Sequence, residues 1–163
     1  MLLRNIAFSA ALALTFSQTA LAEGAQVAFG GLKGDPTAQV EMNADTLTVN
    51  QADGTAVFSG NVVVSQGAMK LSANEVRVAY GADKTSIETL YASGKVLLVN
   101  ASDAAQADNA VYTIASGEVV MTGNVLLTQG QAAMSAGKLV IDLKTGLGRM
   151  EGRVKTTFVP GKK

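Results

Sequence analysis

The chain has 163 residues, which is enough for one domain with a sizeable core and too few for two ordinary domains. Basic and acidic residues number 13 each, so the chain lacks the excess of positive charge that is typical of nucleic-acid-binding proteins. Histidine and cysteine are absent and only 5% of residues are aromatic, which excludes imidazole bases, thiolate nucleophiles, disulfides, the usual zinc ligands and extensive stacking platforms.

Residues 1–22 have the three parts of a secretory signal peptide. Arg4 lies in a short basic region, an apolar run extends from Ile6 to Phe16, and Ala20-Leu21-Ala22 matches a small-x-small cleavage site. The apolar run is about half of the ~20 residues that a membrane-spanning helix needs. We therefore predict that residues 1–22 are cleaved and that residues 23–163 form a single exported domain.

From Pro36 onward the sequence has the pattern of β-strands separated by turns. In 69–74, for example, Met, Leu and Ala alternate with Lys, Ser and Asn, and Gly, Asn, Asp and Ser clusters interrupt such runs. With ~8–12 residues per strand and turn, this pattern predicts an all-β domain of about 12–17 short, mostly antiparallel strands. Residues 23–35 and 156–163 lack the pattern, and we expect them to be loosely ordered.

The chain also contains an internal repeat. Residues 42–80 align without a gap on residues 105–143, and Gly60-Asn61-Val62 matches Gly123-Asn124-Val125. The pair Asp45 and Asp108 also matches, and we expect these carboxylates to cap turns rather than to form an aspartyl dyad. Such repetition indicates stacked β-units, arranged either as a solenoid or as a folded-over jelly roll.

Two segments resemble the OstA-like domain of periplasmic lipopolysaccharide-transport proteins: VFSGNVVVSQGAMKLSANEVRV at 57–78 and VVMTGNVLLTQG at 119–130. Pro36, at the expected start of the first strand, and Val159-Pro160 also match, so the resemblance extends over nearly all of residues 23–163. It implies an OstA-like β-jelly roll, open along its length, whose interior holds the acyl chains of lipopolysaccharide. It further implies a periplasmic protein of outer-membrane assembly that is not an enzyme.

The expected lipid-binding residues are apolar side chains that alternate toward the interior. A carrier of acyl chains needs aliphatic surface, at ~0.8 kcal/mol per buried methylene, and no catalytic group. By resemblance, the family's lipid-contacting positions fall at Val40, Leu47, Val49, Tyr112 and Ile114. For any single residue of the set, simple packing in the core is the alternative role. The complete set is Val40, Leu47, Val49, Phe58, Val62, Val64, Met69, Leu71, Tyr112, Ile114, Met121, Leu127 and Met134.

Charge is unevenly distributed along the chain. Residues 138–163 carry seven basic and two acidic side chains, whereas residues 23–137 carry five basic and eleven acidic ones. We hypothesise that oppositely charged ends favour head-to-tail self-association through the terminal strands. Two alternatives are that Lys138, Arg149 and Arg153 bind the phosphates of the lipid head group, and that the basic end only increases solubility.

The resemblance implies three partners: lipopolysaccharide through its lipid A, transport proteins of the inner and outer membranes, and further copies of the chain. We expect no catalytic residue, no cofactor, no metal site and no nucleic-acid partner. Two alternative functions remain. One is a member of the same transport system that keeps its N-terminal segment as an inner-membrane anchor, and the other is a structural β-solenoid without a lipid cavity.

Overall fold

The computed structural model describes residues 25–28, 32–50 and 52–158, and these form eleven β-strands and no α-helix. The predicted all-β class is confirmed, but the described residues form fewer strands than the 12–17 predicted. The difference arises because six strands are 11–14 residues long and continue through a bend, where the sequence pattern indicates a turn. The strands are β1 (Ala25–Ala28), β2 (Val40–Asn43), β3 (Thr46–Asn50), β4 (Thr55–Gln66), β5 (Met69–Tyr80), β6 (Ile87–Asn100), β7 (Asp103–Thr113), β8 (Glu118–Gln129), β9 (Ala132–Asp142), β10 (Leu147–Glu151) and β11 (Lys155–Phe158).

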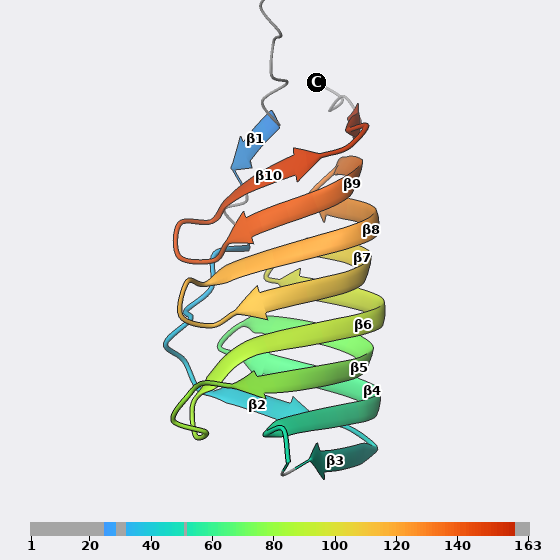
Figure 1. The fold of residues 1–163 in the computed structure, drawn as a ribbon. Coiled ribbons are helices and arrows are strands. Elements are labelled where there is room, and N and C mark those ends of the chain that lie inside the picture. Colours follow the sequence, from blue (N-terminus) through green and yellow to red (C-terminus); the bar gives the residue numbers. More distant parts are fainter. Residues whose placement is uncertain (1–24, 29–31, 51, 159–163) are drawn as a thin grey trace, which may run out of the picture.

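All eleven strands belong to one antiparallel sheet that is folded over on itself (Figure 1). Strands β4 to β9 follow one another in chain order, and the register shifts near the middle of each pairing, for example between Ser59 and Val62 of β4. These shifts divide every long strand into two halves. At one end, β3 pairs with the first half of β4 and β2 with its second half. At the other end, β10 and β11 pair with the two halves of β9.

The sheet therefore consists of two layers joined along the bends. We call them layer A, which ends in β3 and in β1, and layer B, which ends in β2 and in β11. β1 belongs to layer A because it pairs with β10.

The repeated Gly-Asn-Val sequence forms the bends of β4 and β8. Gly60 and Gly123 have φ angles of 78° and 80°, a backbone region that glycine adopts without strain, and the following asparagines have φ 47°. The amide Nδ2 of Asn61 donates to Asp45 Oδ2 at 2.8 Å, and Asn124 donates to Asp108 in the same way. The two aspartates therefore bind the bend of the neighbouring strand and are not together in a dyad.

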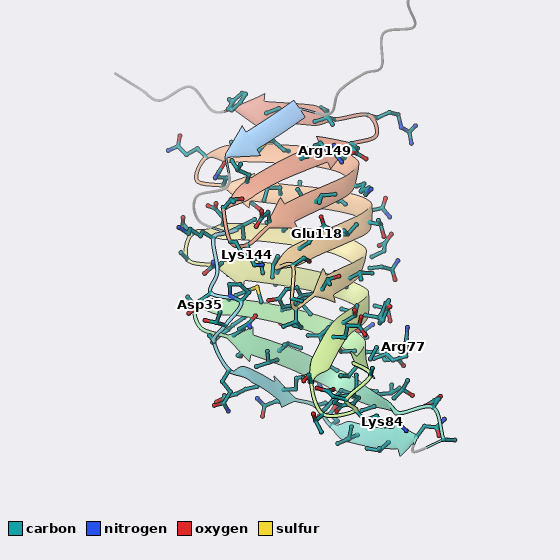
Figure 2. The ribbon with its side chains drawn as sticks, turned by 60° about the vertical axis from the view of Figure 1, so that its left-hand side comes forward. Asp35, Arg77, Lys84, Glu118, Lys144 and Arg149 are labelled. Atoms are coloured by element: carbon teal, nitrogen blue, oxygen red, sulfur yellow. The ribbon has the colours of Figure 1, made fainter. Side chains whose placement is uncertain are left out.

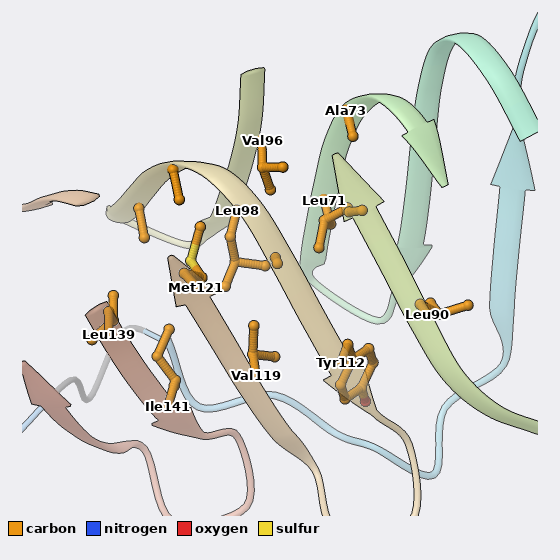
Figure 3. Close-up of a cluster of buried hydrophobic side chains, with 14 of the residues drawn as sticks. Leu71, Ala73, Leu90, Val96, Leu98, Tyr112, Val119, Met121, Leu139 and Ile141 are labelled. Carbon is orange, nitrogen blue, oxygen red and sulfur yellow. The ribbon is translucent and has the colours of Figure 1, made fainter. Parts of the chain in front are cut away.

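The facing surfaces of layers A and B form the hydrophobic core. In Figure 3, side chains from neighbouring strands, including Leu98, Met121 and Ile141, lie in one shared interior. These three side chains are at most 1% exposed. Between β4 and β9, side chains from both layers thus cover one another from solvent.

A segment without strand structure, residues 32–39, runs along one side of the stack and leads to β2 at the end opposite to β1 (Figure 1). We call it the strap. The expectation that 23–35 and 156–163 are loosely ordered is wrong for β1, for residues 32–35 and for 156–158 of β11, because backbone pairing and strap contacts hold them. Pro36 lies in the strap rather than at the start of a strand. Residues 1–22 and Val159-Pro160 lie outside the described residues.

Candidate functional site

Eight of the thirteen predicted lipid-binding residues lie in the buried core, each at most 5% exposed: Val62, Val64, Met69, Leu71, Tyr112, Met121, Leu127 and Met134. Val40, Phe58 and Ile114 are partly buried and pack against the core. The fold brings these eleven side chains to the interior between the layers. In this structure they contact one another or their neighbours, so that the middle of the interior is packed.

Leu47 and Val49 differ from the rest of the set because they are 53% and 61% exposed. They lie on β3, the last strand of layer A at its end, directly opposite Phe58 and Ala56 of β4. Residues that face one another across antiparallel strands project to the same side of the sheet. Since Ala56 is buried in the core, Leu47 and Val49 extend the interior surface beyond its packed part, where it is open to solvent.

The other end of the stack has a comparable residue that the sequence analysis did not identify. Phe158, on β11, is 71% exposed and pairs with Ala132 of β9. Two residues earlier, Thr156 pairs with the buried Met134, so Phe158 also projects to the interior side. The four-residue strand that carries Phe158 is too short for its alternation to be recognised in the sequence.

The three basic residues predicted to contact a head group or a partner lie on the outside. Lys138 of β9 and Arg149 of β10 both approach Glu151, with Lys138 Nζ 3.7 Å from Oε2 and Arg149 Nε 2.9 Å from Oε1. Figure 2 shows the labelled charged side chains, Arg149 among them, around the outside of the stack. Arg153 is exposed at the bend between β10 and β11. The Glu151 carboxylate therefore links Lys138 and Arg149 on the outer face of the sheet, opposite to the core.

The two ends of the stack carry charges of opposite sign. Glu41 on β2 and Asp45 at the β2–β3 bend are exposed at one end. Arg149, Arg153 and Lys155 are exposed on β10, β11 and the bend between them at the other end.

Buried polar side chains line the side where the strap lies. The hydroxyl of Tyr112 donates to Gln66 Oε1 at 2.7 Å, and both residues are at most 2% exposed. Burial raises the pKa of Tyr112, which keeps the hydroxyl in its neutral, donating form. Gln66 Nε2 in turn donates to the carbonyls of Pro36 and Ala38, both at 3.0 Å. Nothing in the sequence pattern assigns a role to Gln66, although the internal repeat pairs it with Gln129.

Within the described residues, no group of three or more His, Cys, Asp or Glu side chains is arranged to hold a metal ion. The same residues include no helix long and apolar enough to cross a membrane.

Comparison with known proteins identifies the family. The family model described as LptA/(LptD N-terminal domain) LPS transport protein matches residues 41–147, which is more than half of the chain. The chain belongs to this family. Its membership confirms the resemblance to OstA-like lipopolysaccharide-transport proteins, and the family description names a transport protein rather than an enzyme. β1, the strap and β11 lie outside the residues matched by the LptA/LptD N-terminal domain model.

Two further proteins are similar to this member of the LptA/LptD N-terminal domain family. An uncharacterized protein of Rhizobium meliloti (strain 1021) is 27% identical over 155 residues, covering 88% of this chain and 83% of its own length. The crystal structure of LptH from Pseudomonas aeruginosa, described as the LptA homologous periplasmic component of the conserved lipopolysaccharide transport device, has a TM-score of 0.70 at 19% identity. That match covers 78% of this chain and 99% of the LptH chain, and it shows that the two share a fold.

Proposed function

We propose that residues 23–163 form one periplasmic domain that binds lipopolysaccharide through the acyl chains of lipid A and bridges transport proteins of the inner and outer membranes, without chemistry of its own. The single observation that supports this best is the apolar interior surface that continues, exposed, onto β3 at Leu47 and Val49. The family description and the predicted signal peptide at 1–22 support a periplasmic role in lipopolysaccharide transport.

The energetics explain why such a surface suits a carrier. Exposing an acyl chain of about 12 methylenes to water costs on the order of 10 kcal/mol at ~0.8 kcal/mol per methylene. Two aliphatic layers offset this cost by covering the chain, and flexible side chains such as Met69 and Met134 adapt to its shape. Because the middle of the interior is packed, bound chains enter at an end or displace part of the core.

The edges of the sheet support end-to-end bridging. β2 and β3 are terminal strands at one end, and β11 is terminal at the other, whereas the edge of β10 is covered by β1. Unpaired edges are templates for strands of another chain. β2 and β11 are both four residues long, and their ends have opposite charge. We therefore propose that β2 of one copy, or the matching strand of another transport protein, pairs with β11.

Photocrosslinking from β3 tests the lipid-binding proposal with a control on the same strand. A photoreactive residue at Leu47 faces the interior side, whereas one at Thr48 faces outward, opposite Val57. We expect lipopolysaccharide to be labelled from position 47 and not from position 48. If neither Leu47 nor any buried residue of the predicted set is labelled, the structural β-solenoid without a lipid cavity becomes the better reading.

Sedimentation at low and high salt tests the electrostatic part of the bridging proposal. Reversing charge at the basic end, with Arg153→Glu and Lys155→Glu, is expected to weaken association at low salt and to reduce its salt dependence. Lys95→Glu is a control because Lys95 is exposed at the bend of β6, a strand that has neighbours on both sides within the stack. Equal association of the native chain at both salt concentrations would contradict steering.

N-terminal sequencing of the exported protein separates the carrier from the anchored alternative. A start near Glu23 is expected. Retention of Arg4 to Ala22 would instead favour the inner-membrane member of the same transport system.

A further inference from the structure

The strap closes the side of the fold that lies opposite the bends. It is bonded to both layers: Gly34 N donates to Leu143 O at 2.9 Å after β9 of layer A, and Asn100 Nδ2 at the end of β6 in layer B donates to Lys33 O at 2.7 Å. Leu32 is 1% exposed within the core. Among the core residues of the described chain, Leu32 and Leu143 are those that lie outside strands.

Where the strap meets layer B, it faces a row of side-chain carboxamides. Gln66, Asn100 and Gln129 are the last residues of β4, β6 and β8, so alternate strands bring them to the same border of the layer. Gln66 and Asn100 donate their amide hydrogens to strap carbonyls, and Gln129 Nε2 donates to Asp103 Oδ2 at 3.0 Å. We call these three residues the amide row.

The amide row borders directly on aliphatic surface. Two residues before each amide, on the same face of its strand, are Val64, Leu98 and Leu127, all at most 1% exposed. A line of hydrogen-bond donors therefore runs along an apolar interior. A fatty acyl group linked through an ester or an amide has matching chemistry, because its carbonyl accepts hydrogen bonds and its chain is apolar.

We propose that the amide row and the aliphatic surface beside it are a binding site for acyl carbonyls and their chains, which the strap occupies in this structure. The carbonyls of Lys33, Pro36 and Ala38 take the place of the acyl carbonyls, and Leu32 takes the place of the start of a chain. Lipid exchanges with the strap, so the amide donors of Gln66 and Asn100 keep a partner in both states.

The strap is the part of the core region whose release disturbs the fold least. Its departure breaks the hydrogen bonds from Gln66, Asn100 and Gly34 and removes the cover of Leu32 and Leu143, whereas separating any long strand would break a ladder of backbone bonds. The strap also lies outside residues 41–147, which the family model matches. The inference rests on the proposed lipid-carrier function and adds to it where the acyl group binds and which segment must leave.

A disulfide that locks the strap provides the test. A Cβ atom built on Gly34 lies 3.7 Å from Leu143 Cβ, close to the ~3.8 Å typical of disulfides. Since the chain has no cysteine, Gly34→Cys with Leu143→Cys creates a single pair. The same molecule, oxidised or reduced, is its own matched control, and melting of the reduced form checks that it folds.

Binding is measured with purified lipid A and, separately, with diacyl phosphatidylethanolamine, which presents the same carbonyl and chain chemistry. We expect oxidation to weaken binding of at least one of them by about tenfold or more, because the locked state cannot become the binding-competent one. The lipid whose binding is weakened by oxidation is the one that supplies the acyl group to the amide row. If native protein binds but oxidation has no effect, the strap inference is overturned and the carrier function stands. If native protein binds neither lipid, both the strap inference and the proposed carrier function are refuted.

Hydrogen exchange in the native chain gives a measurement that does not depend on the cysteine variant. The Gly34 amide donates to Leu143 O in this structure, so lipid binding should accelerate its exchange. Unchanged exchange in the lipid-bound protein would contradict release of the strap. Infrared spectra of lipid A with ¹³C-labelled acyl carbonyls complete the test. The carbonyl band should lie at lower frequency with native protein than with Asn100→Leu, and equal frequencies would contradict carbonyl binding by the amide row.

Discussion

The bend of β8 gives a stability prediction that isolates one close contact. In Gly123→Ala, the added Cβ would lie 2.5 Å from Asp108 Oδ2 and 2.9 Å from Asp108 Cβ, at a φ angle of 80°. Gly130→Ala is a matched control, because Gly130 also has positive φ, at 55°, but no heavy atom lies within 4 Å of its added Cβ. The difference between the two variants therefore measures the contact rather than the backbone conformation.

The structure sets the expected magnitudes. An alanine in the left-handed region costs about 1–2 kcal/mol, which is the whole effect expected for Gly130→Ala. Gly123→Ala adds overpacking of about 1–3 kcal/mol and loss of the hydrogen bond from Asn124 to Asp108, worth about 1 kcal/mol. We expect a total near 4 kcal/mol.

Urea unfolding at equilibrium measures both variants, with the midpoint and the denaturant slope analysed together. Adding Asp108→Ala to Gly123→Ala should restore part of the loss, because the clashing carboxylate is gone. Equal destabilisation by the two glycine substitutions would refute the reasoning, since it would mean that the close approach to Asp108 carries no energetic cost.

Three further predictions concern the side chains that hold the turns and the strap. Tyr112→Phe should destabilise the fold by about 1–3 kcal/mol in urea, because it leaves the buried Gln66 Oε1 without a donor, whereas Tyr91→Phe on the exposed face should cost little; equal effects would contradict a role for the buried bond. Because burial raises the pKa of Tyr112, its contribution to stability should be present below about pH 10 and be lost as pH rises through the folded-state value. Tyr112→Phe should therefore make the melting temperature fall less steeply at alkaline pH. An unchanged fall would contradict a contribution from Tyr112 ionisation. Hydrogen bonds from Ser86 hold the pKa of Asp83 below its ordinary value, so its contribution should be present above about pH 4 and be lost at lower pH. Asp83→Asn should flatten the acid part of the melting profile, and an unaltered profile would contradict this.

The all-β class and the sequence positions of the bends follow from local patterns that are visible in the sequence. Alternation identifies which face of a strand is buried, and Gly-Asn-Val identifies a backbone that needs positive φ. The buried members of the predicted lipid set, such as Val64 and Leu127, were found in this way. What alternation does not reveal is where a sheet ends, and so it did not distinguish the exposed Leu47 and Val49 from the core residues on the same face.

The strap and β1 were not predictable from local pattern because their partners are distant in the chain. Leu32 is one buried leucine in a Gly-rich stretch, and the residues that follow it are held by Leu143 and by amides at the ends of β4 and β6. β1 has four residues, and its order comes from pairing with β10. Asn100 illustrates the same limit, since nothing in the sequence links it to Lys33, whereas in the fold its side chain donates to the Lys33 carbonyl.

The pairing of β1 with β10 also has a consequence for the order of folding. The hairpins from β4 to β9 form between neighbours in the chain and can assemble as each strand becomes available. β1 instead needs a partner more than a hundred residues away, so the first strand of the chain cannot pair until the chain as far as β10 is available. Until β10 has formed, β1 stays unpaired and the layer A edge of β9 stays uncovered. Pairing of β1 with β10 thus removes one exposed edge of the sheet, while β2, β3 and β11 keep theirs for another chain.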